Sequence, residues 1–214
     1  MSCFWCWIYL GKYAYSLGKI IMYYAYLFPG QGSQKVSMGY DLYEKTNIGK
    51  EFFDRANDIM GYDIKEIIFN GPEDKLKETA YTQPAIYIVS VIIGKILLEK
   101  GYEPKMVAGH SLGEYSACTI SRSFSFENGL SLVKLRAENM QIAGKTNPGT
   151  MAAIIGMSFE DIQHICVNAS KEDSVVVPAN HNSPNQIVIS GNISAVQDAM
   201  EHAKESGARL VKEL

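Results

Sequence analysis

Residues 107–114 are Val107-Ala108-Gly109-His110-Ser111-Leu112-Gly113-Glu114, and this stretch decides the fold. Apolar residues precede it and a proline-free, helix-compatible run follows, so the pattern predicts a buried strand, a sharp turn and a helix. The two glycines flank Ser111 with Gly-x-Ser-x-Gly spacing, because a side chain at either glycine would collide with neighbouring backbone in so tight a turn. The spacing predicts an exposed serine hydroxyl at a helix N-terminus, where free N–H groups stabilise a developing oxyanion.

The same pattern can arise by chance, since the chain contains 18 glycines. The apolar residues upstream and the helix-compatible residues Leu112–Ile120 downstream are the context that a nucleophile elbow requires. This context favours Ser111 as a nucleophile over a chance occurrence.

The composition is that of an ordinary globular protein, with 47% hydrophobic residues, 20% charged residues and a net charge of −3. The negative charge and the lack of a basic cluster argue against nucleic-acid binding. Cys3, Cys6, Cys118 and Cys166 are too few and scattered for a disulfide framework, so we expect a reducing, cytoplasmic compartment. Cys3-x-x-Cys6 has metal-ligand spacing without a second pair of ligands, so no metal site is predicted.

Residues 1–21 differ in composition from the rest of the chain. They hold both tryptophans, half of the cysteines, two lysines and no acidic residue. A secretory signal has a basic region before its apolar region, but here the apolar run comes before Lys12. Lys12 and Lys19 also interrupt the stretch of about 20 apolar residues that a membrane span would need. We expect an atypical, non-native N-terminal extension with Met22 as the natural start; a weak membrane-surface anchor is the alternative.

Residues 22–145 alternate between predicted strands and predicted helices. Strands are expected at Tyr23–Phe28 and immediately before Gly109, and helices at 50–60, 73–79, 83–100, 112–120 and 126–142. This alternation predicts an α/β fold with a parallel sheet. The helix at 83–100 has almost no polar face, so we expect it to be buried.

The order of elements changes after Gly144. Strands are predicted at 151–155, 175–178, 186–190 and 208–211, and helices at 158–168, with Ser158 as N-cap, and 192–206. This β-α-β-β-α-β order is that of a ferredoxin-like subdomain. Gly144–Gly149, which contains Asn147-Pro148, marks a boundary, so the predicted domains are 22–145 and 146–214.

Several motifs occur in one order along the chain. They are Phe28-Pro29-Gly30-Gln31-Gly32-Ser33-Gln34, Thr82-Gln83-Pro84-Ala85, Gly109-His110-Ser111-Leu112-Gly113-Glu114-Tyr115-Ser116, Met151-Ala152-Ala153-Ile154-Ile155-Gly156 and Asn180-His181-Asn182-Ser183-Pro184-Asn185-Gln186. From Met22 to Leu214 the chain resembles stand-alone bacterial malonyl-CoA:acyl-carrier-protein transacylases. The resemblance implies an α/β-hydrolase-like large domain with an inserted ferredoxin-like subdomain.

The resemblance also implies an activity: transfer of a malonyl group from malonyl-CoA to the phosphopantetheine thiol of acyl carrier protein, through a seryl ester, for fatty acid biosynthesis. No cofactor is implied. Carried over by position, Ser111 is the nucleophile, and the backbone N–H groups of Gln31 and Leu112 form the oxyanion hole. His110 and Asn182 line the site.

Arg136 has two interpretations. The family places here the arginine that pairs bidentately with the malonyl carboxylate, a task that suits a planar, permanently charged group. From the residues alone, Arg136 would be a solvated helix charge beside Lys134 and Glu138. Only the resemblance favours the carboxylate-binding role.

A serine hydroxyl needs a base to take its proton. His110 is adjacent to the nucleophile, so its side chain leaves the elbow in another direction and we expect it to support the turn. His164 and His202 lie on predicted helices as surface or partly buried residues, and His181 lies in a predicted loop at a variable family position. The family's general-base histidine is expected beyond Leu214, so the chain resembles a C-terminally truncated enzyme with weak or no activity.

The expected partners are malonyl-CoA and acyl carrier protein, without nucleic acid or membrane, and the expected state is a monomer. Three alternatives remain open: an acyltransferase module of a polyketide or fatty-acid synthase, a serine esterase, and a catalytically impaired fragment that binds carrier protein. The lack of a flanking domain favours the stand-alone enzyme. Arg136 and the Gly30–Gln34 loop argue against an esterase.

Overall fold

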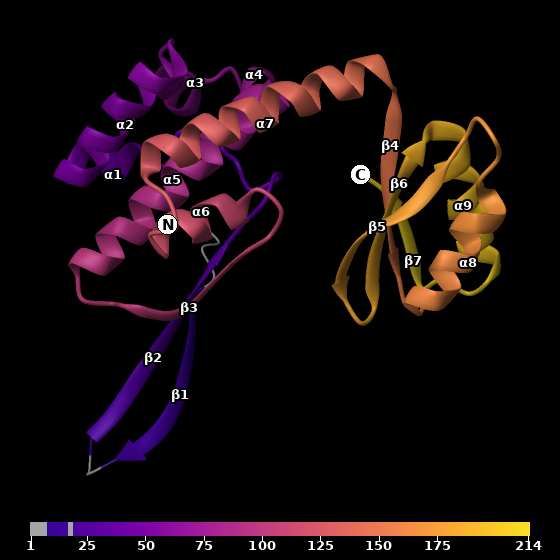
Figure 1. The fold of residues 1–214 in the computed structure, drawn as a ribbon, viewed down its shortest axis with the longest axis horizontal. Helices are drawn as coiled ribbons and strands as arrows, with labels where there is room; N and C mark the ends of the chain where they lie inside the picture. The colour runs from indigo at the N-terminus through magenta and orange to yellow at the C-terminus, as the bar shows by residue number, and fades with distance from the viewer. Residues whose placement is uncertain (1–7, 17–18) are drawn as a thin grey trace. The chain divides into compact units, whose positions relative to one another are not determined.

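The computed structural model describes residues 8–16 and 19–214, which form two compact units that divide between Gln141 and Ile142 (Figure 1). The division lies within helix α7 (Phe126–Thr146), whereas the sequence places the boundary after residue 145. Gly144, Gly149 and the Asn147-Pro148 pair mark where α7 ends. Contacts with the first unit end earlier: Ala137 is the last residue that α7 buries, and the Gln141 side chain still accepts a hydrogen bond from the Ala80 N–H of that unit.

The first unit contains a three-stranded sheet of β1 (Ile8–Ser16), β2 (Lys19–Phe28) and β3 (Pro104–Gly109), in the order β1-β2-β3. The parallel pairing of β2 with β3 confirms the expected parallel arrangement, while β1 runs antiparallel to β2. Pairing with β1 extends β2 beyond the predicted start at Tyr23. The expected extension at 1–21 thus lies partly in this hairpin, and Cys3 and Cys6 lie outside the described residues.

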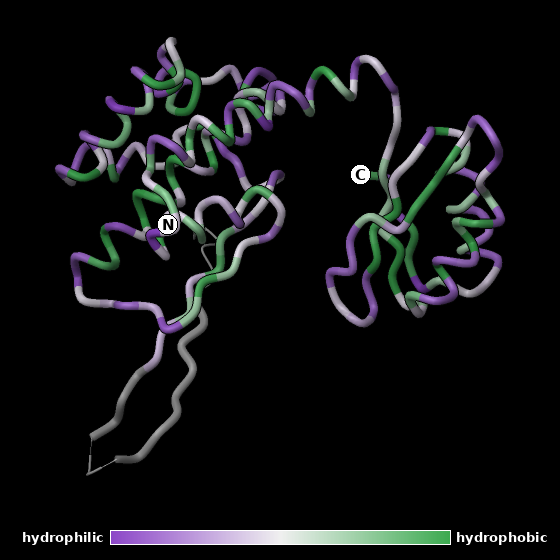
Figure 2. Tube along the Cα trace, viewed as in Figure 1, coloured by the Kyte–Doolittle hydropathy of each residue, from purple (hydrophilic) through white to green (hydrophobic). Residues whose placement is uncertain are grey.

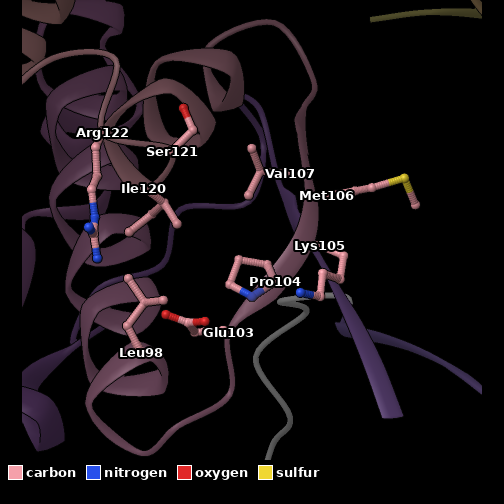
Figure 3. Close-up of a pocket in the computed structure, with 9 residues that line it drawn as sticks. All are labelled: Leu98, Glu103, Pro104, Lys105, Met106, Val107, Ile120, Ser121 and Arg122. Carbon is pink, nitrogen blue, oxygen red and sulfur yellow. The ribbon is translucent and has the colours of Figure 1, made fainter. Parts of the chain in front are cut away.

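β3 is more exposed than the predicted buried strand. Among the described residues it pairs on one side only, with β2, and Met106 is 70% exposed. A cavity of about 290 Å³ lies beside β3 and is lined in part by Leu98, Val107 and Ile120 (Figure 3). A second cavity, of about 390 Å³, follows the strand toward Gly109. Burial of a strand depends on what covers both faces of its sheet, which the hydrophobic run alone does not report.

The helices of the first unit are α1 (Tyr40–Lys45), α2 (Asn47–Met60), α3 (Ile64–Asn70), α4 (Glu73–Lys77), α5 (Thr79–Glu99), α6 (Gly113–Ile120) and α7. In α2, the Thr46 hydroxyl accepts a hydrogen bond from the Gly49 N–H, and Gly61 ends the helix with a left-handed φ of 77°. Helices α1 and α3 were not predicted. Such short helices depend on tertiary packing rather than on propensity.

Helix α5 is the apolar core helix of this unit. It begins at Thr79, earlier than predicted, and contains Pro84. Of the described helices, only α5 is long and apolar enough to span a membrane, and 67% of its apolar window is buried inside the unit. Buried residues from β2, α2, α3, α6 and α7 form one core with it, which confirms the predicted burial. Polar side chains of α5 are buried as well, namely Thr82, Gln83 and Ser90.

The second unit contains β4 (Gly149–Ile155), α8 (Phe159–Ala169), β5 (Val176–Ser183), β6 (Gln186–Asn192), α9 (Ile193–Glu205) and β7 (Leu210–Glu213). Its sheet has the order β5-β6-β4-β7 with every neighbouring pair antiparallel, as the ferredoxin-like prediction requires. One face buries apolar residues under α8 and α9, and Figure 2 shows hydrophobic residues along these strands. The predicted cap is confirmed, because Ser158 Oγ accepts from the Asp161 N–H at 3.1 Å.

Strand β5 extends past its predicted end at Pro178 and includes the segment predicted as a loop. β5 is the edge of its sheet, where a residue without an N–H is tolerated, and the register shifts between Pro178 and Asn180. His181 and Asn182 therefore lie on a strand. The sequence prediction of a loop at this position is wrong.

Candidate active site

The turn between β3 and α6 has the geometry of a nucleophile elbow. Ser111 has a φ of 54°, a left-handed conformation that is uncommon for a residue with a side chain and stores about 1–3 kcal/mol of strain. A Cβ at Gly109 would lie 2.0 Å from the carbonyl carbon of Gly113. A Cβ at Gly113 would lie 2.2 Å from the Phe28 oxygen. The steric reason given for both glycines is confirmed.

Hydrogen bonds within the turn engage the N–H groups of Gly113 and Glu114 but not that of Leu112. The N–H of Gly113 donates to the His110 carbonyl at 2.9 Å, and that of Glu114 donates to the Ser111 carbonyl at 3.2 Å. In the part of the chain that the structure describes, no acceptor engages the N–H of Leu112. Ser111 itself is exposed, and Leu112 anchors the turn with a buried side chain. Among the described residues, the N–H of Leu112 thus stays available as a hydrogen-bond donor, at the residue that follows Ser111.

The Gly30–Gln34 loop packs directly against the elbow. A Cβ at Gly30 would lie 2.9 Å from the carbonyl oxygen of His110 and 3.0 Å from its Nδ1, so only glycine allows this approach. Gly32 has a φ of 100°, and Ser33 Oγ donates to the Gly30 carbonyl at 2.8 Å. These contacts fix the loop that carries Gln31 next to the turn that carries the serine.

Arg136 of α7 contacts the nucleophile candidate. Its Nη2 donates to Ser111 Oγ at 3.0 Å, and its Nη1 donates to Gln83 Oε1 at 2.6 Å. The side chain is half-buried, with its guanidinium carbon 5.9 Å from the centre of the Tyr115 ring. This geometry opposes the interpretation of Arg136 as a solvated helix charge. Its neighbour Lys134 has a structural contact instead, donating to the Met60 carbonyl at the end of α2 at 2.9 Å.

The sequence predicts no role for Gln83, and the structure places it at the site, in contact with Arg136. Its side chain is 1% exposed within the apolar helix α5. A buried amide requires hydrogen-bond partners, but Gln83 follows Thr82 at the start of the apolar run, so the sequence carried no clear signal that it is buried. The sequence could not identify Arg136 as that partner, because the contact joins two helices far apart along the chain.

The remaining predicted residues lie as follows. His110 is on the elbow, and His164 and His202 are exposed, as expected. His181 is exposed and stacks on the Phe159 ring at 5.3 Å, and Asn182 Nδ2 donates to Gln186 Oε1 at 3.4 Å within the second unit. Over the described ranges, no group of three His, Cys, Asp or Glu side chains is arranged to hold a metal ion.

The sequence profile of the acyl transferase domain family matches residues 25–213, nearly the whole chain. The chain belongs to the acyl transferase domain family. A curated relative of this acyl transferase domain, the malonyl CoA-acyl carrier protein transacylase of Bacillus subtilis (strain 168), is 40% identical over 185 residues, which cover 86% of this chain and 58% of the relative.

Solved structures of malonyl transacylases have the same fold as this chain. The acyl transferase domain superposes on MCAT from Streptococcus pneumoniae with a TM-score of 0.83 at 46% identity, covering 89% of this chain and 62% of that one. It also matches a malonyl-transacylase solved in complex with a type II PKS acyl-carrier protein, with a TM-score of 0.82, 40% identity and coverage of 88% and 61%. The α/β acyltransferase fold is thus confirmed. The chain spans about 60% of the length of these relatives.

Proposed function

We propose that this acyl transferase domain transfers a malonyl group from malonyl-CoA to the phosphopantetheine thiol of acyl carrier protein, through an ester on Ser111. One observation carries the proposal: a guanidinium nitrogen of Arg136 lies 3.0 Å from an exposed serine hydroxyl at the apex of a strand-to-helix elbow. The relative from Bacillus subtilis and the structure solved with a carrier protein are named as malonyl transacylases, which supports the same substrate.

In the first half-reaction the Ser111 oxygen attacks the thioester carbonyl of malonyl-CoA. The C–S bond breaks, the malonyl group stays on the serine, and the hydroxyl proton ends on the coenzyme A thiol. The tetrahedral intermediate carries a negative oxygen, which the N–H groups of Leu112 and Gln31 would stabilise. The approach of Gly30 to His110 supports this pairing, because it brings the Gln31 loop against the elbow.

Arg136 would select the malonyl group. A malonyl ester on Ser111 places a carboxylate a few bonds from the serine oxygen, within the range of a guanidinium that contacts that oxygen in the free protein. Charge-assisted bonds from two guanidinium nitrogens bind a carboxylate with matched geometry. An acetyl group offers no such acceptor, so Arg136 would favour malonyl over acetyl donors.

The second half-reaction would release malonyl-carrier protein when the phosphopantetheine thiol attacks the ester. The carrier protein belongs to fatty acid biosynthesis in this proposal. The match to a transacylase complexed with a type II PKS carrier protein makes a polyketide carrier protein the second candidate. We further propose a cytoplasmic monomer that needs no metal or redox cofactor and binds neither nucleic acid nor membrane.

Intact-protein mass spectrometry of the 214-residue chain after incubation with malonyl-CoA tests the proposal, with Ser111→Ala as the matched control. We expect a malonyl adduct on the natural sequence, formed slowly because the contact that the described residues give to Ser111 Oγ is the guanidinium of Arg136 and not a base, and no adduct on the control. The absence of an adduct on the folded chain, or an adduct that persists in Ser111→Ala, would overturn the proposal for these residues.

A further inference from the structure

The N–H of Gln31, one of the two proposed oxyanion donors, lies in a loop with little backbone support. Among the described residues, no N–H or C=O group of residues 30–34 makes a hydrogen bond to another backbone group. Glycines lie on both sides of Gln31, and Gly32 has a φ of 100°, so the peptide groups next to Gln31 meet little steric resistance to rotation. The direction of this N–H therefore depends on side chains of the loop.

Ser33 holds the peptide group that carries this N–H. Its Oγ donates to the Gly30 carbonyl at 2.8 Å. The Gly30 C=O and the Gln31 N–H belong to the same planar peptide group, in which they point in opposite directions. A hydrogen bond that holds the carbonyl therefore also sets the direction of the N–H. It makes the N–H a stronger donor as well, because hydrogen bonds to one peptide group polarise each other.

Gln34 holds the next peptide group along the loop. Its Oε1 accepts from the Gly32 N–H at 2.8 Å, and this N–H belongs to the peptide group that joins Gln31 to Gly32. The two peptide groups on either side of Gln31 are thus both held by side chains that follow within three residues. Gly30 is buried against the elbow, where a Cβ would lie 2.9 Å from the His110 oxygen, so the start of the loop is fixed beside the serine.

We propose that Ser33 and Gln34 are positioning residues that direct the Gln31 N–H toward the oxyanion of the Ser111 adduct. The inference rests on the proposed function and deepens it by adding two residues that act through Gln31. The oxyanion forms from the thioester carbonyl oxygen, which malonyl and acetyl donors share. Both side chains should therefore affect acylation by the two donors equally, whereas Arg136 should affect mainly the malonyl donor.

Three variants test the proposal. Ser33→Ala removes the hydroxyl donor, Ser33→Thr keeps it, and Gln34→Met removes the amide acceptor at similar volume. The rate of Ser111 acylation is measured by mass spectrometry over a range of malonyl-CoA and of acetyl-CoA concentrations. Circular dichroism establishes that each variant is folded.

Two matched controls make the same substitutions away from the loop. Ser121→Ala is the control for serine, because Ser121 Oγ also donates to a carbonyl three residues earlier, that of Cys118, at 3.0 Å. Gln141→Met is the control for glutamine, because Gln141 Oε1 also accepts from a backbone N–H, that of Ala80, at 2.9 Å. Neither control alters a hydrogen bond of the loop.

We expect Ser33→Ala and Gln34→Met to lower the maximal acylation rate about tenfold or more with both donors, up to the roughly 10²–10³-fold loss that removal of one oxyanion donor causes. The concentration that gives half of this rate should change by less than about twofold, because the N–H acts on the intermediate rather than on the bound donor. Ser33→Thr and both controls should stay within about threefold of the natural rate. An unchanged rate in Ser33→Ala, a loss confined to malonyl-CoA, or an equal loss in Ser33→Thr would overturn the proposal.

A second readout is independent of acyl transfer. The ¹⁵N relaxation of the Gln31 amide should report a rigid N–H in the natural sequence, in Ser33→Thr and in both controls, and a mobile N–H in Ser33→Ala. An equally rigid Gln31 amide in Ser33→Ala would refute the positioning role. If the natural chain forms no malonyl adduct, the proposed function fails, and the relaxation measurement still decides whether Ser33 holds the Gln31 N–H.

Discussion

Replacing Gly113 with alanine should destabilise the first unit and remove acylation of Ser111. The added Cβ would lie 2.2 Å from the Phe28 oxygen, 2.7 Å from the Phe28 carbonyl carbon and 2.8 Å from the Pro29 oxygen. All three are backbone atoms at the end of a core strand, so no side-chain rotation relieves the overlap.

The size of the destabilisation follows from the backbone atoms that the added Cβ would displace. The Phe28 carbonyl accepts the N–H of His110 at 3.0 Å and so joins β2 to the elbow. Displacing it breaks that bond, at about 1–3 kcal/mol for an unsatisfied buried acceptor, and the overpacking itself costs about 1–3 kcal/mol. We therefore expect a loss of roughly 2–6 kcal/mol in the free energy of unfolding.

Gly144→Ala is the matched control, because a Cβ at Gly144 of α7 meets no atom within 4 Å. This change should be neutral or stabilising by about 0.5–1 kcal/mol, since alanine favours a helix over glycine. Urea denaturation followed by circular dichroism measures both variants, and mass spectrometry follows acylation by malonyl-CoA. If Gly113→Ala matched the natural sequence within about 0.5 kcal/mol and still formed the adduct, the steric argument for the elbow would be wrong.

Three further predictions concern the same unit and the thiols. Arg136→Ala should lower the rate of acylation by malonyl-CoA about tenfold or more while sparing acetyl-CoA, and equal losses with both donors would assign Arg136 a structural role. Tyr87→Phe should lower the free energy of unfolding by about 1–2 kcal/mol, because the buried hydroxyl lies 2.8 Å from Thr119 Oγ1 and donates to the Phe126 carbonyl at 3.0 Å. Thermal and urea denaturation measure this loss, and an unchanged midpoint would contradict it. Burial raises the pKa of the Cys166 thiol to about 11, so at pH 8 iodoacetamide should label the half-buried Cys118 before Cys166. Labelling of Cys166 should increase as the pH rises. Peptide mapping that found Cys166 labelled first would refute this order.

Local rules made the elbow and the small subdomain predictable from the sequence. The spacing of Gly109 and Gly113 reports a steric requirement that acts within a few residues, and Ser158 caps a helix through a contact three residues away. The alternation of strands and helices after Gly144 yields the ferredoxin-like order because antiparallel neighbours in so short a segment have few possible arrangements.

The first and last residues of strands and helices were less predictable, because they depend on pairing and packing with segments far along the chain. β2 extends by pairing with β1, β5 continues past Pro178 because it is an edge strand, and α1 and α3 are held by packing. The exposure of β3 also depends on the rest of the fold, since burial of a strand depends on what covers the faces of its sheet.

The sequence by itself determined that Ser111 stands on a strained turn at a helix N-terminus, because the glycines that allow this turn are its immediate neighbours. Only the tertiary structure decided what surrounds that serine. Gln83 and Arg136 lie on α5 and α7, and their contact depends on how two helices pack around one core. Periodicity shows that each helix has a buried side, but it does not show which side chains of two helices meet.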